Sequence, residues 1–296
     1  MGQRSDRMTT MNTNKRAVST RLQSRTAMFL PVQQISKNFA SCDIVVTNEY
    51  GTITLRECKL TQVHRNIIDV IFSSYEPIRF DDGSVAFSFS KYDLLKSLGH
   101  SARRNTKWLE NKFEEMRKAS VVLEANQSGR TTTGYQGVVR EHQETRFKSS
   151  QGTPLYGVVF SSNFMKMFDI DLTVHSAKLT PKILGLEHAV TQAFVRACIS
   201  HRQINRDLDE ILVSIGVNHD SVSDRAYRKN RKSVLDEMEA LESEFGIIIK
   251  PMQKDSNKWG VFYAQHKDVW FSNPNQNISL EQKELFSSDD PDAELV

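Results

Sequence analysis

Five basic side chains that could bind phosphates and base edges fall within eight residues: Arg225, Arg228, Lys229, Arg231 and Lys232. Apolar residues recur in and after this stretch at spacings of seven, four, three and four, which predicts one stripe along a helix. They are Tyr227, Val234, Met238, Leu241 and Phe245. Arg225, Lys229 and Lys232 fall opposite this stripe, Arg228 lies to its side and Arg231 at its edge. The charge turns acidic from Asp236 onward. A helix that is basic only in its first half is typical of one that presents that half to a polyanion.

The neighbouring segments predict a helix-turn-helix arrangement. Glu210 to Gly216 is apolar-patterned and ends at a glycine, as a helix entering a tight turn often does. In this arrangement the second helix enters the major groove of DNA by its N-terminal part. Apolar Ile247–Ile249 predicts a strand, and the expected hairpin at 251–260 carries Lys254 and Lys258 as candidate phosphate contacts.

The same pattern occurs earlier in the chain. Asp93 to Gly99 matches Glu210 to Gly216 almost position for position. The basic residues after it, Arg103, Arg104 and Lys107, fall opposite an apolar face formed by Leu109, Phe113 and Met116. Apolar Val121–Leu123 corresponds to Ile247–Ile249, and Arg130, among glycines, marks a second wing. Two such units predict a duplicated winged-helix domain.

The predicted fold class is therefore α+β, with two tandem winged-helix domains at residues 28–150 and 151–271. The polar run 141–154 sets the boundary, and a strand at 155–160 is expected to open the second domain. Residues 1–27 are basic without periodicity, and we expect a disordered arm that is either inert or touches DNA. Residues 272–296 become polar and then acidic, and we expect a disordered tail.

The composition indicates more about the cellular compartment of the protein than about its binding partner. The net charge of +3 and pI near 8.6 do not by themselves indicate nucleic acid. Cys42, Cys58 and Cys198 are widely spaced and odd in number, which argues against a disulfide framework or a zinc site and for a reducing compartment. No apolar run approaches the roughly 20 residues that span a bilayer. We expect a cytoplasmic protein without a membrane partner.

The patterns of common catalytic sites are absent from the sequence. There is no GxxxxGK[ST] loop and no GxGxxG after a strand, which argues against nucleotide hydrolysis and dinucleotide binding. The histidines form neither HxH nor HExxH, and Tyr227 falls on the predicted apolar face, where a core aromatic is expected. We therefore expect no catalytic residue, no metal and no cofactor.

The order of elements resembles the plasmid replication initiators that bind iterons, the repeated sites at a plasmid origin. The resemblance covers residues 50–265 and rests most on Phe87 to Gly99 and on Val158 to Phe164. It implies two tandem winged helices, the second reading one major groove of duplex DNA and the first contacting an adjacent groove or backbone. It also implies origin opening, recruitment of host replication proteins, and a homodimer that represses the protein's own gene while monomers bind the origin.

The acidic tail contains a short motif of its own. Gln282, Leu285 and Phe286 resemble the peptide by which bacterial proteins bind the replicative sliding clamp, where glutamine enters a polar pocket and the other two side chains an apolar one. Lys283 departs from the leucine that is commoner at its position. The alternative is a stray hydrophobic pair in a polar tail.

Three other interpretations remain open from sequence. The chain could be a winged-helix transcriptional repressor without a role in replication, or a DNA-processing enzyme. The basic helix faces could also be no more than solvated surface.

Overall fold

The computed structural model describes residues 18–35, 43–125, 135–148, 154–217, 222–252 and 255–273. It has the expected mixed α+β composition. Several sequence predictions lie outside the described residues, namely those on the arm before Val18, Arg130, Lys254, and the tail with Gln282, Leu285 and Phe286.

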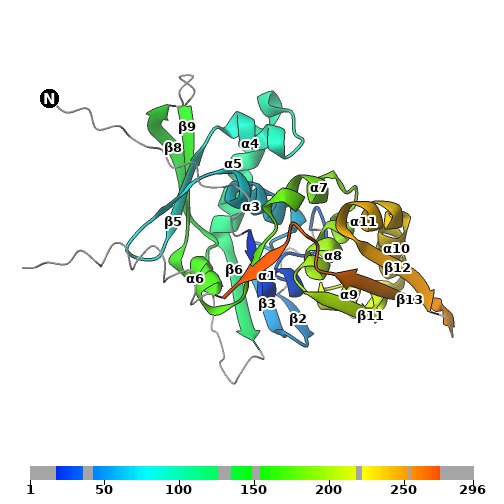
Figure 1. Ribbon diagram of the computed structural model, residues 1–296. Coiled ribbons are helices and arrows are strands. Elements are labelled where there is room, and N and C mark those ends of the chain that lie inside the picture. The colour runs from blue at the N-terminus through cyan, green and yellow to red at the C-terminus, as the bar shows by residue number, and fades with distance from the viewer. Residues whose placement is uncertain are drawn as a thin grey trace, which may run out of the picture.

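The helices and strands fall into two successive groups (Figure 1). The first comprises β1 (Ser19–Thr20), α1 (Arg21–Arg25), β2 (Ile44–Asn48), β3 (Gly51–Glu57), α3 (Gln62–Ser74), β4 (Pro77–Arg79), β5 (Val85–Phe89), α4 (Lys91–Ser97), α5 (Ala102–Lys118), β6 (Ala119–Ala125), β7 (Tyr135–Gln136), β8 (Val139–Lys148), β9 (Pro154–Phe160) and α6 (Ser162–Ile170). The second comprises β10 (Thr173–His175), the 3-10 turn η2 (Ala177–Leu179), α7 (Thr180–Gly185), α8 (Ala189–Ile199), β11 (Gln203–Asp207), α9 (Leu208–Ser214), α10 (Asp224–Asp236), α11 (Met238–Phe245), β12 (Ile247–Met252), β13 (Asp255–Ala264) and β14 (Trp270–Ser272).

Two hydrophobic cores divide the described chain. The core of the N-terminal unit runs from Leu22 to Met167, and the core of the C-terminal unit from Val174 to Val269. The N-terminal unit holds two antiparallel sheets, in the strand orders β2-β3-β6-β7 and β4-β5-β9-β8. The C-terminal unit holds the sheet β11-β13-β12, and β1 reaches across to pair with β10 beside β14. Helix α8 is buried along its whole length, so the C-terminal unit is built around it.

The repeated helix pair predicted from sequence is present in both units. Helices α4 and α9 each end at a glycine in the left-handed region, Gly99 at φ +75° and Gly216 at φ +91°. The amide after each glycine donates to a carbonyl five residues back, at 2.9 Å in both cases: His100 to Leu95, and Val217 to Leu212. Each turn ends the first helix and is followed by a second helix, α5 or α10, as the spacing predicted.

The units differ in how their strands pair. In the C-terminal unit β11, β13 and β12 share one sheet, whereas in the N-terminal unit β5 pairs with β9 and β6 pairs with β3. The domain boundary expected after residue 150 falls between β8 and β9, two paired strands of one sheet. Strand β9 and the following α6 contribute Phe160 and Phe164 to the N-terminal core. The strand expected to open the second domain therefore packs with the first.

Two further expectations do not match the structure. The helix predicted as continuous to Phe245 breaks at Glu237, which leaves helical geometry at φ −102° and ψ 14°. A carboxylate oxygen of Glu237 accepts the backbone N–H of Glu187 at 2.8 Å. Residues 18–27, expected within the disordered arm, instead form β1 and α1 and are mostly buried. The Asp171 carboxylate accepts the backbone N–H of Leu22 and pairs with Arg21, which fixes this segment.

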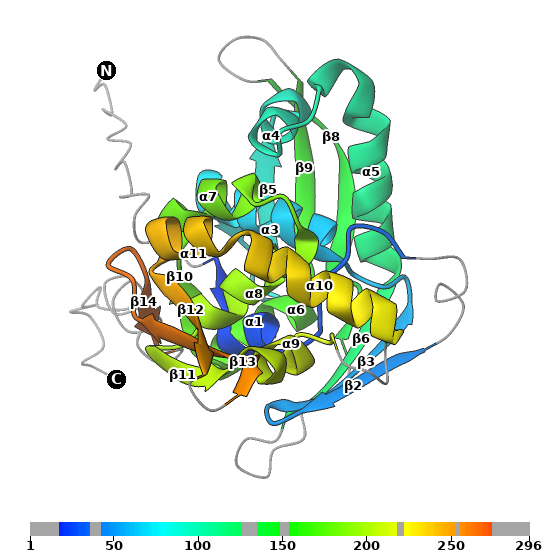
Figure 2. The ribbon, with the colours of Figure 1, turned by 90° about the vertical axis from the view of Figure 1, so that its right-hand side faces the viewer.

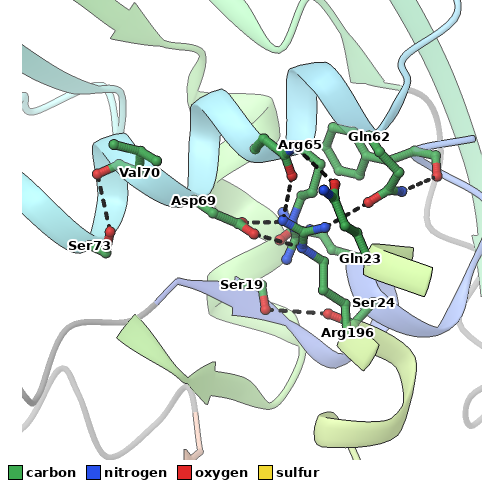
Figure 3. A network of polar contacts seen from close by, with 12 residues as sticks. Ser19, Gln23, Ser24, Gln62, Arg65, Asp69, Val70, Ser73 and Arg196 are labelled. Carbon is green, nitrogen blue, oxygen red and sulfur yellow. Dashed lines mark hydrogen bonds and ion pairs between the residues drawn. The ribbon is translucent and has the colours of Figure 1, made fainter. Parts of the chain in front are cut away.

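A buried polar network joins the two units at α3 and α8 (Figure 3). The carboxylate of Asp69 accepts from Arg65 Nε at 2.7 Å and from Arg196 Nε at 2.8 Å. The other two nitrogens of Arg196 donate to Gln62 Oε1 at 2.8 Å and Asn66 Oδ1 at 2.7 Å. Burial lowers the pKa of the Arg196 guanidinium, and the nearby Asp69 charge opposes that shift. Buried charges are tolerated when they are paired and hydrogen-bonded in this way.

A second polar contact joins the units at the β2–β3 turn. The Asn48 amide donates to the carbonyls of Arg25 at 3.1 Å and Ser214 at 2.8 Å. Glu49, the next residue, pairs with Arg206 on β11. The β2–β3 turn thus contacts the C-terminal unit, as does the N-terminal segment through Arg25, whose Nε donates to Ser200 Oγ at 3.0 Å.

Replacing Asp69 with alanine should destabilise the protein strongly, because two buried guanidinium groups lose their shared carboxylate. We expect Asp69→Ala to lower the free energy of unfolding in urea by about 3–5 kcal/mol. The matched control is Asp43→Ala, which removes an exposed carboxylate 3.4 Å from Arg56 and should cost at most about 1 kcal/mol. Equal effects of the two substitutions would contradict a structural role for the buried network.

Candidate nucleic-acid interface

One face of α10 is anchored to the C-terminal core. Ser223 caps the helix, its Oγ accepting the N–H of Ala226 at 3.3 Å. Tyr227 and Val234 are buried, as the apolar stripe predicted. Burial raises the pKa of the Tyr227 hydroxyl, and a hydrogen bond with the Asp209 carboxylate raises it further. This aromatic side chain therefore anchors the helix, as expected of a core residue.

Arg231 takes part in that anchoring. Its Nε donates to Asp209 Oδ1 at 2.8 Å, which ties α10 to α9. The sequence placed Arg231 at the edge of the apolar stripe and among the candidate DNA contacts. In the structure its guanidinium already has a carboxylate partner within the chain.

The remaining basic residues of α10 point away from the core: Arg225, Arg228, Lys229 and Lys232, here called the α10 cations. All four are exposed, and no hydrogen bond or ion pair joins them to another residue in the described part of the chain. Because α10 is seated by its other face, these side chains are presented together on one rigid helix. Such an arrangement can bind a row of phosphates or the edges of bases.

The β12–β13 hairpin adds further cations beside this helix. It projects from the body at the right of Figure 1, and Figure 2 shows it with α10 on the face toward the viewer. Lys258 is exposed on β13, as expected, whereas Lys254 lies outside the described residues. Lys250 is also exposed, and it was not among the sequence candidates. The alternation of buried Ile247 and Ile249 with outward residues could have identified it.

The corresponding helix of the N-terminal unit is less fully described. Leu109, Phe113 and Met116 of α5 are buried, as predicted, and Lys107 is exposed. The side chains of Arg103 and Arg104 lie outside the description. Figure 2 shows the N-terminal ends of α5 and α10 toward the right-hand side of the molecule, the α5 end above the α10 end.

Two titratable groups with strongly shifted pKa values, His201 and Glu115, take part in contacts within the fold. Burial lowers the pKa of His201 to about 3, and the charges of Arg25 and Arg206 add to the effect. Burial would raise the pKa of Glu115, but hydrogen bonds from His64 and Lys112 outweigh it and hold that pKa at about 2.

The part of the chain that the structure describes has neither a cluster of metal ligands nor a membrane-spanning helix. It contains no cluster of three or more His, Cys, Asp or Glu side chains placed to hold a metal ion. None of its helices is both long and apolar enough to span a bilayer. Cys58 and Cys198 are free thiols.

Among solved structures, the chain is similar to the Pi initiator protein in its crystal structure with iteron DNA. The two are 11% identical in sequence with a TM-score of 0.45, and the alignment covers 71% of this chain and 93% of that chain. This is a protein of the kind that the sequence was found to resemble. No family model and no curated protein sequence matches the chain.

Exposed and buried residues of α10 should differ sharply in their effect on stability. Lys229→Ala and Lys232→Ala should each change the free energy of unfolding by no more than about 0.5 kcal/mol, because neither side chain has a partner among the described residues. Tyr227→Ala should lower it by about 3–5 kcal/mol, since a buried aromatic ring is lost. Urea titrations measure both. A destabilising lysine substitution would show that the lysine has a structural role.

Proposed function

We propose that the protein binds double-stranded DNA sequence-specifically through two tandem winged-helix domains and acts as a plasmid replication initiator at repeated origin sites. The observation that carries the proposal is the set of four α10 cations, exposed without partners on a helix whose opposite face is fixed in the core. Lysine and arginine that neutralise phosphates release counterions, so the affinity should fall steeply with salt.

The order α8, β11, α9, α10, α11, β12 and β13 supports the assignment of a winged helix to the C-terminal unit. In that fold the helix after the turn enters the major groove, and the hairpin reaches an adjacent backbone. The α10 cations would then discriminate bases, while Lys250, Lys254 and Lys258 bind phosphates. Arg103, Arg104 and Lys107 of α5, with Arg130, would position the N-terminal unit on the same duplex. The Nε of Arg231 already donates to Asp209 within the chain.

The double substitution Arg228→Ala with Lys229→Ala should abolish the preference for cognate repeats in gel-shift titrations at fixed salt. Each good base contact is worth roughly 1–3 kcal/mol of discrimination. The matched control, Arg202→Ala with Lys267→Ala, removes the same charge from exposed positions outside α10 and the hairpin, and should keep the preference. If the folded α10 double variant discriminates as well as the parent does, these residues do not read sequence.

Replication and repression make different demands on the same DNA-binding surface. An initiator should occupy several spaced repeats and sustain a plasmid that carries them, whereas a repressor alone should occupy one promoter palindrome. Tandem repeats of about 20 base pairs beside the gene, spaced by nearly whole helical turns, would favour the initiator. In that role the protein would also open the origin and recruit host replication proteins, with a homodimer serving repression. The proposal includes no catalytic step, so supercoiled DNA should remain intact with divalent metal present.

The tail motif gives a second, independent proposal, that Gln282, Leu285 and Phe286 bind the replicative sliding clamp. Two adjacent apolar side chains in an otherwise acidic segment favour an anchor in an apolar pocket. Leu285→Ala with Phe286→Ala should abolish co-purification with a sliding clamp, while Leu295→Ala with Val296→Ala should not. Equal retention of the parent and the Leu285/Phe286 variant would show that the motif is coincidental.

A further inference from the structure

The charge of the chain is divided unequally between its C-terminal sixteen residues and the rest. Residues 281–296 hold six carboxylates, at Glu281, Glu284, Asp289, Asp290, Asp292 and Glu294. They hold one basic residue, Lys283, and so carry a net charge of −5. Because the whole chain carries +3, residues 1–280 carry +8. A polyanion and a cationic surface are thus present in one molecule.

We propose that this acidic segment binds in cis over the α10 cations and the hairpin lysines, and that DNA must displace it. The proposal rests on the DNA-binding function assigned to that surface. The four α10 cations lack partners within the described chain, and Lys250 and Lys258 are exposed on the β12–β13 hairpin. Carboxylates form charge-assisted hydrogen bonds with the guanidinium and ammonium groups that otherwise meet phosphates. The segment therefore occupies the surface as a substitute for the DNA backbone.

The chain between the fold and the acidic segment is long enough for this contact. The described residues end at Asn273, just after β14, and eight further residues lead to Glu281. At about 3.3 Å per extended residue, Glu281 can reach about 26 Å from Asn273 and Glu294 about 70 Å. A folded chain of this size has a radius of gyration of about 19 Å, which corresponds to a diameter of about 50 Å. Along the surface of such a sphere opposite points lie about 80 Å apart, so the four carboxylates from Asp289 to Glu294, with a reach of about 53–70 Å, can meet α10 unless it lies nearly opposite Asn273.

The competing site for the same carboxylates is the basic N-terminal arm, with Arg4, Arg7, Lys15 and Arg16. The α10 cations are favoured because Tyr227 and Val234 already fix their helix in the core. Ordering a chain segment costs conformational entropy, and a surface that the fold already holds in place adds no such cost of its own. Tethering also raises the local concentration of the segment to about the millimolar range.

The proposed contact lowers the affinity of the protein for all DNA. A segment that must leave the surface completely weakens specific and non-specific complexes by the same factor. Non-specific sites, which are held by phosphate contacts, then lose their bound protein first, while sites that also offer base contacts stay occupied. The segment thus limits the protein to its cognate sites without itself reading a base.

The first test detects the contact without DNA. Zero-length carbodiimide coupling of the full-length protein, followed by peptide mapping, should join carboxylates of 281–296 to Lys229, Lys232, Lys250 or Lys258. Mixing isotopically light and heavy protein separates coupling within one chain from coupling between chains. Coupling only to Lys15, only between chains, or not at all overturns the proposal. This readout decides whether the contact forms, even if the protein binds no DNA.

The second test measures the competition. A variant with all six carboxylates changed to Asn or Gln keeps the length of the segment and its Leu285 and Phe286. It should bind non-cognate duplex about three- to tenfold more tightly than the parent in 50 mM salt, and less than about twofold more tightly in 300 mM salt, because salt screens exposed charges. A control with residues 287–296 in scrambled order keeps the charge and should behave as the parent. Equal affinity of the neutralised variant and the parent at low salt contradicts the proposal, and so does cis coupling to α10 without any change in affinity.

Discussion

The carboxylate of Asp69, shared by two buried guanidinium groups, is the contact on which the arrangement of the molecule depends. Arg196 comes from the core helix of the C-terminal unit, while Asp69, Arg65 and Gln62 come from α3 of the N-terminal unit. Buried charges are costly unless every polar atom is paired, so such a network allows few relative positions of the two helices. An interface of apolar side chains alone would tolerate sliding more easily.

The fixed arrangement of α3 and α8 also positions the helices that pack against them. Helix α8 carries Arg196 and packs against α10, and α3 packs against α4, which precedes α5. Fixing α3 against α8 therefore also fixes the starts of α5 and α10 relative to each other. Under the proposed function, in which both units contact one duplex, a spacing that is set before binding favours affinity, because no further ordering is needed on the DNA.

The two sides of helix α10 have different roles: one side holds the helix in the core, and the other carries the cations that are proposed to bind DNA. Tyr227, Val234 and the Arg231–Asp209 pair hold it in place, while the α10 cations have no structural task within the described chain. Their number and position can therefore change without loss of the fold. The same freedom leaves them open to any polyanion, whether the DNA backbone or an acidic segment of the same chain.

The sequence alone was enough to predict which face of each helix is apolar, where the two glycine turns fall, and which side chains of α10 are exposed, because these features depend on periodicities within a few turns of chain. It could not determine that β5 pairs with β9 while β6 pairs with β3, since alternation shows that a strand has a buried face but not which strand it meets. Nor could it show that residues 18–27 dock against Asp171, or that Arg231 is held by Asp209. These contacts join residues distant in the sequence, and only the tertiary structure brings them together.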